Sequence, residues 1–344
     1  GGRDKSSPIF FWRSTAMNRL LGACVLLLLS FPVGLVAQED HGASRERLER
    51  LERQVRSLRF AAQAAEQRSL ELSFLLEAEG IARYEKIRYT SSADGRIIPA
   101  HLWTPLNTGD RQLPALIWVH GGVHGHLAHY YWRLIRDVLQ EGYVVLAPEY
   151  RGSTHHGRRH YNALDYGGME VEDCVSGRDW LLEMHANVDP NRVGIIGWSH
   201  GGFITMHALY RAPEKFKVGV NVVGVSDLVE RMGYKSESYR RTFAEQKGFG
   251  GYAYEKLEPY LERSPAHQAH RLQTPLLIHA ASNDDDVRIN EITHLIDALK
   301  AAGKEFEYEI YQDPPGGHFL NRINTRTAED SWRKIKAFLG RHLK

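Results

Sequence analysis

The sequence predicts an α/β fold in which a mostly parallel β-sheet is covered by helices on both faces and is preceded by one long helix. Two observations lead to this prediction. From residue 113 onward, short continuous apolar runs alternate with amphipathic helical stretches, as expected for buried parallel strands joined by helices. Before them, residues 44–79 contain no proline and no glycine, and apolar side chains recur there in three- and four-residue steps.

The composition is that of an ordinary globular protein with one sizeable core. The 344 residues are 42% hydrophobic and 25% charged, and 44 Lys and Arg against 42 Asp and Glu leave a formal net charge of +2. This balance gives no indication of a nucleic-acid partner. Of the two cysteines, Cys24 lies in a segment that we expect to be removed, so no internal disulfide is expected for Cys174.

Residues 17–37 have the pattern of a secretory signal peptide. An apolar run lies between the positively charged Arg19 and the break at Pro32, and the small residue Ala37 precedes a polar stretch. Residues 1–16 are then expected to be upstream sequence, and the protein is expected to be secreted or periplasmic, with no stable membrane insertion after cleavage. An uncleaved membrane anchor is the alternative, although the apolar run is shorter than the ~20 residues that a membrane span needs.

Residues 44–79 are predicted to form a coiled-coil-like helical arm, which ends at Gly80. Its apolar positions follow a heptad pattern: Leu48, Leu51, Val55, Leu58, Ala62, Ala65, Ser69, Leu72 and Leu76. Because the side chains at the centre of this pattern are small, the arm buries little there. We expect self-association into a homo-oligomer, with docking on the following domain or recruitment of a partner as alternatives.

Residues 81–344 are predicted to form one domain. It begins with two alternating strand-like runs around the turn Asp94-Gly95, which predict an antiparallel hairpin. Strands and helices are then expected in this order: ALIWVH, YYWRLIRDVLQEG, YVVLAP, VEDCVSGRDWLLEM, RVGIIG, the helix of residues 201–210, VGVNVVG, PLLIHA, EITHLIDALKAAG, FEYEIYQ and AEDSWRKIKAFLGRHL.

The motif GWSHGG, residues 197–202, follows an apolar strand and precedes a helical pattern. In this context G-x-S-x-G predicts a sharp strand-to-helix turn that exposes the hydroxyl of Ser199 at the carboxyl end of the sheet. The backbone N–H of His200 would then point to the place where an oxyanion forms. A second such N–H is expected at Gly122, in the glycine-rich loop after the first apolar strand. An ordinary strand-to-helix turn is the alternative.

A serine hydroxyl is a poor nucleophile at neutral pH unless a histidine accepts its proton and a carboxylate holds the imidazole. Both residue types follow Ser199 in the required order. Asp284, Asp285 and Asp286 come directly after a later apolar run, and His318 lies in a glycine-flanked loop after the next one. The order serine, acid, histidine is that of hydrolases with this strand-to-helix turn.

These motifs resemble the prolyl oligopeptidase family of serine peptidases, which has the α/β-hydrolase fold. The resemblance covers about residues 84–343 and rests on the blocks VHGG, EYRGSTHHG, DWLLEMHANVDPNRVGIIGWSHGGF, FKVGVNVVGVSDL, SPAHQAHRLQTPLLIHAASNDDDV and GGHF. It implies that Ser199 is the nucleophile and His318 the base. It also implies that Asp284 is the acid, because the family's acid stands three residues before a valine; Asp285 is the competing candidate.

The sequence departs from the family in two places. Full-length members carry a β-propeller that filters substrates by size ahead of the hydrolase domain, and here the helical arm precedes that domain. Prolyl-cleaving members place an arginine beside the acid, where this sequence has Asp286. An anionic side chain there is expected to favour a cationic or amino-bearing substrate. Trp198 either lines the substrate pocket or packs beneath the turn.

Together these features predict a serine hydrolase that cleaves amide bonds of short peptides through an acyl-enzyme intermediate, without a metal or organic cofactor. A carboxylesterase with the same three residues is the alternative, and a non-catalytic protein that assembles through the helical arm is a third hypothesis. Arg151 and Asp173 are interpreted as structural. Two loops are rich in histidine, a common zinc ligand, so a metal site is a lesser alternative. One loop contains His120, His124, His126 and His129, and the other contains His155, His156 and His160.

Overall fold

The computed structural model describes residues 41–344, with side chains from residue 44. The predicted signal peptide, residues 17–37, and the segment before it lie outside the described residues. Within residues 41–344, no helix combines the length and the apolar character that are needed to cross a bilayer. The chain divides after Phe60 into two units, and the second, Ala61–Lys344, contains the sheet.

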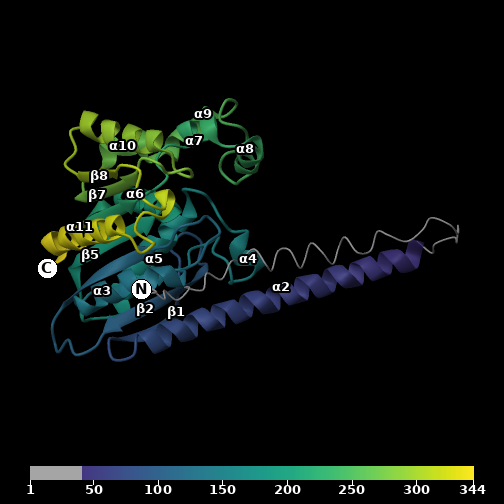
Figure 1. Ribbon diagram of the computed structural model, residues 1–344. Coiled ribbons are helices and arrows are strands. Elements are labelled where there is room, and N and C mark those ends of the chain that lie inside the picture. The colour runs from purple at the N-terminus through teal and green to yellow at the C-terminus, as the bar shows by residue number, and fades with distance from the viewer. Residues whose placement is uncertain (1–40) are drawn as a thin grey trace, which may run out of the picture. The chain divides into compact units, whose positions relative to one another are not determined.

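One eight-stranded sheet forms the centre of the second unit (Figure 1). Its strands are β1 (Ala82–Thr90), β2 (Ile97–Pro105), β3 (Leu113–Val119), β4 (Val144–Pro148), β5 (Val188–Trp198), β6 (Val218–Val222), β7 (Leu276–Ala281) and β8 (Glu307–Tyr311). The spatial order is β1-β2-β4-β3-β5-β6-β7-β8. β1 and β2 form the predicted antiparallel hairpin, β2 pairs with β4 in the antiparallel sense, and all later pairs are parallel. The predicted α/β-hydrolase fold is therefore confirmed.

Helices cover both faces of this sheet. The α-helices are α2 (His41–Glu77), α3 (Trp132–Gln140), α4 (Arg158–Tyr161), α5 (Met169–Met184), α6 (His200–Arg211), α7 (Leu228–Tyr234), α8 (Glu237–Ala244), α9 (Leu257–Glu262), α10 (Ile289–Ala301) and α11 (Arg326–Leu343). Short 3-10 helices are η1 (His129–Tyr131), η2 (Pro213–Lys215), η3 (Pro265–Arg271) and η4 (Gly317–Phe319). One apolar core lies between the sheet and α5, α6 and α10, and the other between the sheet and α3 and α11.

The alternation of side chains along a strand explains the two cores. In β3, Ile117 and Val119 point into the core beneath α5 and α6, whereas Leu116 and Trp118 point into the core beneath α3 and α11. A strand buried on both faces needs apolar residues at every position, which is why the strand reads as a continuous apolar run.

The order of the strands in the sheet indicates where a ligand-binding site is expected. β3 lies between β4 and β5, so the chain leaves β3 toward one neighbour and later returns on its other side. In open α/β sheets, ligands bind at the carboxyl ends of strands where the order reverses in this way. The loop after β3 and the turn after β5 meet there, and these are the segments that carry the glycine-rich loop and Ser199.

The end of helix α2 packs on the β1–β2 hairpin through a face that the heptad pattern did not predict. Phe74 and Ala78 are buried, and the Phe74 ring meets Trp103 edge-on at 5.2 Å. The large apolar heptad residues are instead exposed: Leu48, Leu51, Val55, Leu58, Leu72 and Leu76. Salt bridges of the i,i+4 type join exposed arginines and glutamates on the same helix, as in Arg56–Glu52 at 3.4 Å. This end of the helix is therefore docked, as the docking alternative describes. The large apolar residues of the heptad pattern stay exposed.

Candidate active site

Ser199 occupies a strained turn between β5 and α6. Its backbone has φ 56° and ψ −119°, a region that residues other than glycine rarely adopt. The turn also leaves no room for side chains on either side of it. A Cβ at Gly197 would lie 2.1 Å from the carbonyl oxygen of Gly201, and a Cβ at Gly201 would lie 2.2 Å from that of Val119. This packing explains why the motif needs glycine at both positions.

The structure brings Ser199, His318 and Asp284 into one chain of hydrogen bonds. The Oγ of Ser199 lies 2.9 Å from Nε2 of His318, and Nδ1 of the same ring lies 2.7 Å from Oδ2 of Asp284. His318 stands on η4 after β8, and Asp284 on the loop after β7, so all three lie beyond the carboxyl ends of parallel strands. This arrangement suits proton transfer from serine to histidine. The catalytic roles of the three residues stay a prediction.

Asp284, and not Asp285, contacts the histidine. The Oδ1 atom of Asp284 accepts hydrogen bonds from the backbone N–H groups of Asp286 and Val287, both at 2.8 Å. These bonds fix the carboxylate so that Oδ2 faces His318. The side chain of Asp285 is exposed and makes no such contact. Between the two candidate acids, the geometry supports Asp284.

The two predicted oxyanion donors belong to the residue that follows Ser199 and to the glycine-rich loop after β3. As the first residue of α6, His200 has no intrahelical acceptor for its N–H. Gly122 has φ 80°, which orients its amide as few other residues could, and its carbonyl accepts a 2.7 Å hydrogen bond from the hydroxyl of Tyr150. The backbone of Gly121 packs directly against Ser199, because a Cβ at Gly121 would lie 3.3 Å from that of the serine.

Tyr131, which no sequence motif indicated, supports this loop. Its hydroxyl accepts a 3.1 Å hydrogen bond from the N–H of Gly121, and its ring is buried. Burial raises the pKa of Tyr131 well above its usual range, so the hydroxyl keeps its proton. The only signal in the sequence was the aromatic cluster at the start of the helix after the glycine-rich loop. Tyr131 therefore helps to hold the loop that carries Gly122.

Trp198 lies beneath the turn and does not line a substrate pocket. The side chain is completely buried, its ring packs 4.7 Å from Trp118 and 5.1 Å from Tyr131, and its Nε1 donates a 2.6 Å hydrogen bond to Asn321. The expectation that Trp198 binds substrate is therefore corrected, and the packing alternative describes it. Trp198 is the last residue of β5, and its side chain points into the core between the sheet and helices α3 and α11.

Asp286 lies beside the histidine but is already paired. One carboxylate oxygen lies 2.7 Å from Nζ of Lys235, and the other lies 3.5 Å from Nη2 of Arg231 and 3.7 Å from Nε2 of His318. Burial alone would raise the pKa of Asp286, but the charge of Arg231 and the hydrogen bond from Lys235 lower it below its usual range. No sequence motif indicated these two cations, because they stand on and after α7, some fifty positions earlier in the chain.

A buried acid and a buried imidazole lie under the turn. Nε2 of His200 is 3.7 Å from Oε1 of Glu170. Burial lowers the pKa of His200 well below its usual range and raises the pKa of Glu170 to about 8. At neutral pH both side chains are therefore uncharged, and the pair is not an ion pair. The backbone N–H groups of Gly167 and Gly168 bind the carboxyl of Glu170.

Most of the loop histidines make hydrogen bonds to the protein itself. His120 lies 3.0 Å from Oγ of Ser153 and 3.4 Å from the buried carboxylate of Glu149. Burial alone would raise the pKa of Glu149, but the charge of His120, together with hydrogen bonds from His101 and other imidazoles, lowers it well below its usual range. His126 and His155, one from each loop, approach Glu66. The two loops thus touch, and their histidines mainly brace the glycine-rich loop.

Arg151 and Asp173 form one buried ion pair, which agrees with their structural interpretation. The guanidinium reaches Asp173 at 2.7 and 2.9 Å and continues to Asp94 in the β1–β2 turn at 2.9 Å. Both charges are almost fully buried. The pair therefore ties the loop after β4 to helix α5 and to the hairpin.

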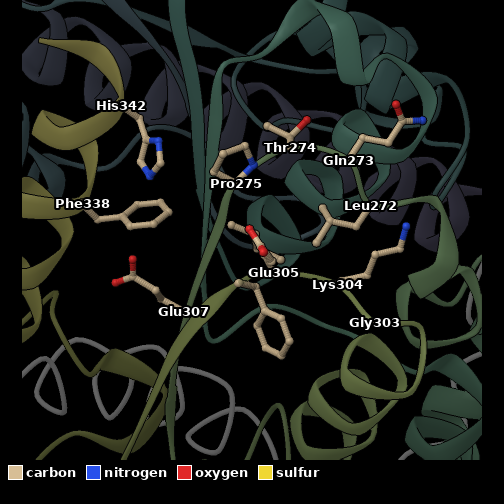
Figure 2. Close-up of a pocket in the computed structure, with 12 residues that line it drawn as sticks. Leu272, Gln273, Thr274, Pro275, Gly303, Lys304, Glu305, Glu307, Phe338 and His342 are labelled. Atoms are coloured by element: carbon tan, nitrogen blue, oxygen red, sulfur yellow. The ribbon is translucent and has the colours of Figure 1, made fainter.

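Figure 2 shows the residues that line a pocket of about 480 Å³. It is lined at the amino ends of β7 and β8 by residues that include Leu276 and Glu307, and by Phe338 and His342 of α11. Because parallel strands present their amino ends at one edge and their carboxyl ends at the other, this pocket is remote from Ser199.

Comparisons with known proteins agree with this architecture. The family model described as the prolyl oligopeptidase family matches residues 130–344, which include Ser199, Asp284 and His318 but not Gly122. The chain is 30% identical over 241 residues to the uncharacterized peptidase YuxL of Bacillus subtilis, covering 69% of this chain and 36% of YuxL. It is 28% identical to dipeptidyl aminopeptidase BIII of Pseudoxanthomonas mexicana, covering 69% of this chain and 36% of that protein.

A solved structure has the same fold. The acylaminoacyl peptidase of Pyrococcus horikoshii superposes with a TM-score of 0.69 at 21% identity, covering 79% of this chain and 44% of that chain. The chain thus spans about a third of the length of the curated relatives it matches, at 36% of the first two. The family model covers more than half of the chain, and the parallel sheet, the strained serine turn and the ordered acid and histidine loops accompany it. The chain belongs to the prolyl oligopeptidase family of serine hydrolases.

Proposed function

We propose that this chain is the catalytic part of a serine peptidase that cleaves amide bonds of short peptides through an acyl-enzyme intermediate. The observation that carries the proposal is the hydrogen-bonded series from Ser199 through His318 to Asp284, at 2.9 and 2.7 Å. An unpaired serine would be a weak nucleophile, whereas this geometry supplies both a proton acceptor and a group that orients it.

In the proposed reaction, Oγ of Ser199 attacks the acyl carbonyl carbon while Nε2 of His318 accepts the hydroxyl proton. The carboxylate of Asp284 stabilises the imidazolium that forms, and the imidazolium then protonates the leaving amine. The backbone N–H groups of His200 and Gly122 stabilise the negative charge on the carbonyl oxygen. Water, deprotonated by the same histidine, releases the acyl group and restores the serine.

The substrate class rests on the family and on the surroundings of the serine. The relatives carry the names of a dipeptidyl aminopeptidase and an acylaminoacyl peptidase, and both names refer to bonds at the ends of peptides. The idea that Asp286 attracts a cationic substrate stays a prediction. Its ion pairs with Lys235 and Arg231 oppose that idea, because they compensate the charge that would attract such a group.

Matched substrates test this proposal. Alanyl, prolyl and lysyl chromogenic amides and the corresponding esters are offered to the wild type and to Ser199→Ala, with Asp286→Ala as the specificity variant. We expect amide cleavage that disappears in Ser199→Ala, and a ratio of lysyl to alanyl cleavage that is the same in the wild type and in Asp286→Ala. Ester cleavage without amide cleavage would reassign the protein to the carboxylesterases, and no hydrolysis of either class would refute the proposal.

We also propose that the protein is secreted or periplasmic. The support is the charged, apolar and small-residue pattern of residues 17–37. Expression in a bacterial host with its own secretion machinery, followed by N-terminal mass analysis, should find a mature chain that begins after Ala37. An intact Arg19 on a membrane-bound product would instead support an uncleaved anchor.

We further propose that the arm self-associates through its exposed heptad stripe. Leu51, Leu58 and Leu72 are each about half exposed or more, and they recur at the spacing of a coiled-coil seam. Sedimentation velocity on the wild type and on Leu58→Lys compares the oligomeric states, with Arg50→Glu as a charge-changing control on the same helix. A wild-type monomer, or an oligomer that Leu58→Lys leaves intact, would refute the proposal.

A further inference from the structure

A second constellation of polar side chains lies outside the active site. Asp227 follows β6 and precedes α7, His267 stands on η3, and His294 stands on α10. The Oδ2 atom of Asp227 lies 2.5 Å from Nδ1 of His294 and 3.6 Å from Nε2 of His267. The two imidazole rings meet edge-on at 5.2 Å, and one donor atom from each of the three residues lies within 4.8 Å of the others.

The carboxylate of this constellation is built into the fold. The Asp227 side chain is only 4% exposed, and its Oδ1 accepts hydrogen bonds from the backbone N–H groups of Val229 at 2.8 Å and Glu230 at 3.1 Å. These bonds leave Oδ2 alone to face the imidazoles. Outer-shell hydrogen bonds of this kind orient the ligands of metal sites. The histidines are 33% and 46% exposed, so an ion can reach the site from solvent.

A hydrogen bond between Asp227 and His294 accounts for only two of the three groups. Nε2 of His267 points at the same oxygen from beyond hydrogen-bond range, at 3.6 Å. In a tetrahedral zinc site with bonds of roughly 2.1 Å, neighbouring donor atoms lie roughly 3.4 Å apart. The Asp227–His267 distance of 3.6 Å is close to this value, and the Asp227–His294 distance of 2.5 Å reaches it if the exposed imidazole withdraws by about 1 Å.

We propose that Asp227, His267 and His294 bind a first-row divalent cation, Zn²⁺ in the first instance, with water in the fourth position. Two imidazoles and one carboxylate are donors that Zn²⁺ prefers. The ion would join η3, α7 and α10. Because α7 carries Arg231 and is followed by Lys235, and both contact Asp286 beside the catalytic histidine, the site would stiffen one wall of the active site.

Calorimetric titration of the chelator-treated protein with Zn²⁺ tests this inference. The variants are His267→Ala, His294→Ala and Asp227→Asn, the last of which keeps an oxygen to cap α7. The control is His270→Ala, an exposed histidine on the same 3-10 helix. We expect the wild type and the control to share a 1:1 site whose affinity falls more than about 100-fold in the three ligand variants, since losing only an outer-shell partner costs about 10–100-fold.

A thermal measurement gives a second readout. Zn²⁺ at about 100 times Kd should raise the Tm of the wild type and of His270→Ala by about 5 °C, and should leave His294→Ala unchanged. Equal affinity in the wild type, His267→Ala and His294→Ala would overturn the inference. It would also be overturned if the tight site vanished in His155→Ala instead, because Zn²⁺ would then occupy the cluster of Glu66, His126 and His155.

Discussion

The substitution Asp284→Asn tests whether the reactivity of Ser199 depends on which ring nitrogen of His318 carries the proton. Two backbone N–H groups, of Asp286 and Val287, donate to Oδ1 of Asp284 at 2.8 Å. An asparagine must therefore keep its carbonyl oxygen on that side, because the reverse orientation would lose two hydrogen bonds worth about 1 kcal/mol each and oppose donor to donor. Its NH₂ group then faces His318.

This orientation imposes the wrong tautomer on the histidine. The NH₂ group would donate to Nδ1 of His318 across the present 2.7 Å contact, so the ring proton would move to Nε2, the nitrogen 2.9 Å from Oγ of Ser199. A protonated Nε2 cannot accept the serine proton. We expect kcat to fall on the order of 10⁴-fold, which corresponds to about 5 kcal/mol of barrier.

The assay is kcat and kcat/KM on a chromogenic substrate for the wild type, Asp284→Asn and Asp285→Asn. The third protein is the matched control, because Asp285 is exposed and does not contact the ring. Circular dichroism melts show whether each variant is folded. A loss of less than tenfold in a folded Asp284→Asn, or an equal loss in Asp285→Asn, would refute the reasoning from hydrogen-bond direction.

Three further predictions follow from the surroundings of the turn. Tyr131→Phe removes the acceptor of the Gly121 N–H, and leaving a buried donor unpaired costs about 1–3 kcal/mol, so kcat/KM should fall roughly tenfold or more; unchanged kinetics would contradict the role of this hydroxyl. Gly201→Ala should reduce soluble expression and Tm, because its Cβ would lie 2.2 Å from the Val119 carbonyl oxygen, and a wild-type melting curve would contradict the packing. Glu170→Gln should make stability less dependent on pH between about 5 and 8. The pKa of Glu170 rises from 4.5 to about 8 on folding, so the unfolded chain loses this proton at lower pH than the folded chain does. The stability of the wild type therefore falls with rising pH by up to about 1.4 kcal/mol per pH unit. If Tm changed with pH equally in Glu170→Gln and in the wild type, this prediction would be contradicted.

The proximity of Ser199, Asp284 and His318 was predictable because it follows from the topology. Residues that directly follow apolar strands in a parallel sheet lie at one edge, so Ser199, an aspartate and His318 had to lie near one another. The choice between Asp284 and Asp285 was not predictable from the residues alone. It depends on which side chain the backbone of the loop turns inward, and adjacent residues in a loop have no fixed period.

Contacts between distant segments were not predictable. Arg231 approaches Asp286 from helix α7 and Lys235 from the residue after it, and no local pattern links positions that far apart. The arm shows a related limit. Phe74, near the end of α2, and Ala78, directly after it, are both buried, while the heptad residues form an exposed apolar stripe on the helix. Periodicity identified the helix, but only the shape of the neighbouring domain decides which stripe it covers.

The most direct test of the account is the site of covalent labelling by a fluorophosphonate, which reacts with activated serines. Intact-mass analysis of the wild type should show one adduct, and peptide mapping should locate it on Ser199. Ser199→Ala should remain unlabelled, and Asp284→Asn should label far more slowly than Asp285→Asn. An adduct on another residue, or no adduct on a folded wild-type protein, would contradict the claim that the hydrogen-bonded series of Ser199, His318 and Asp284 makes this serine a nucleophile.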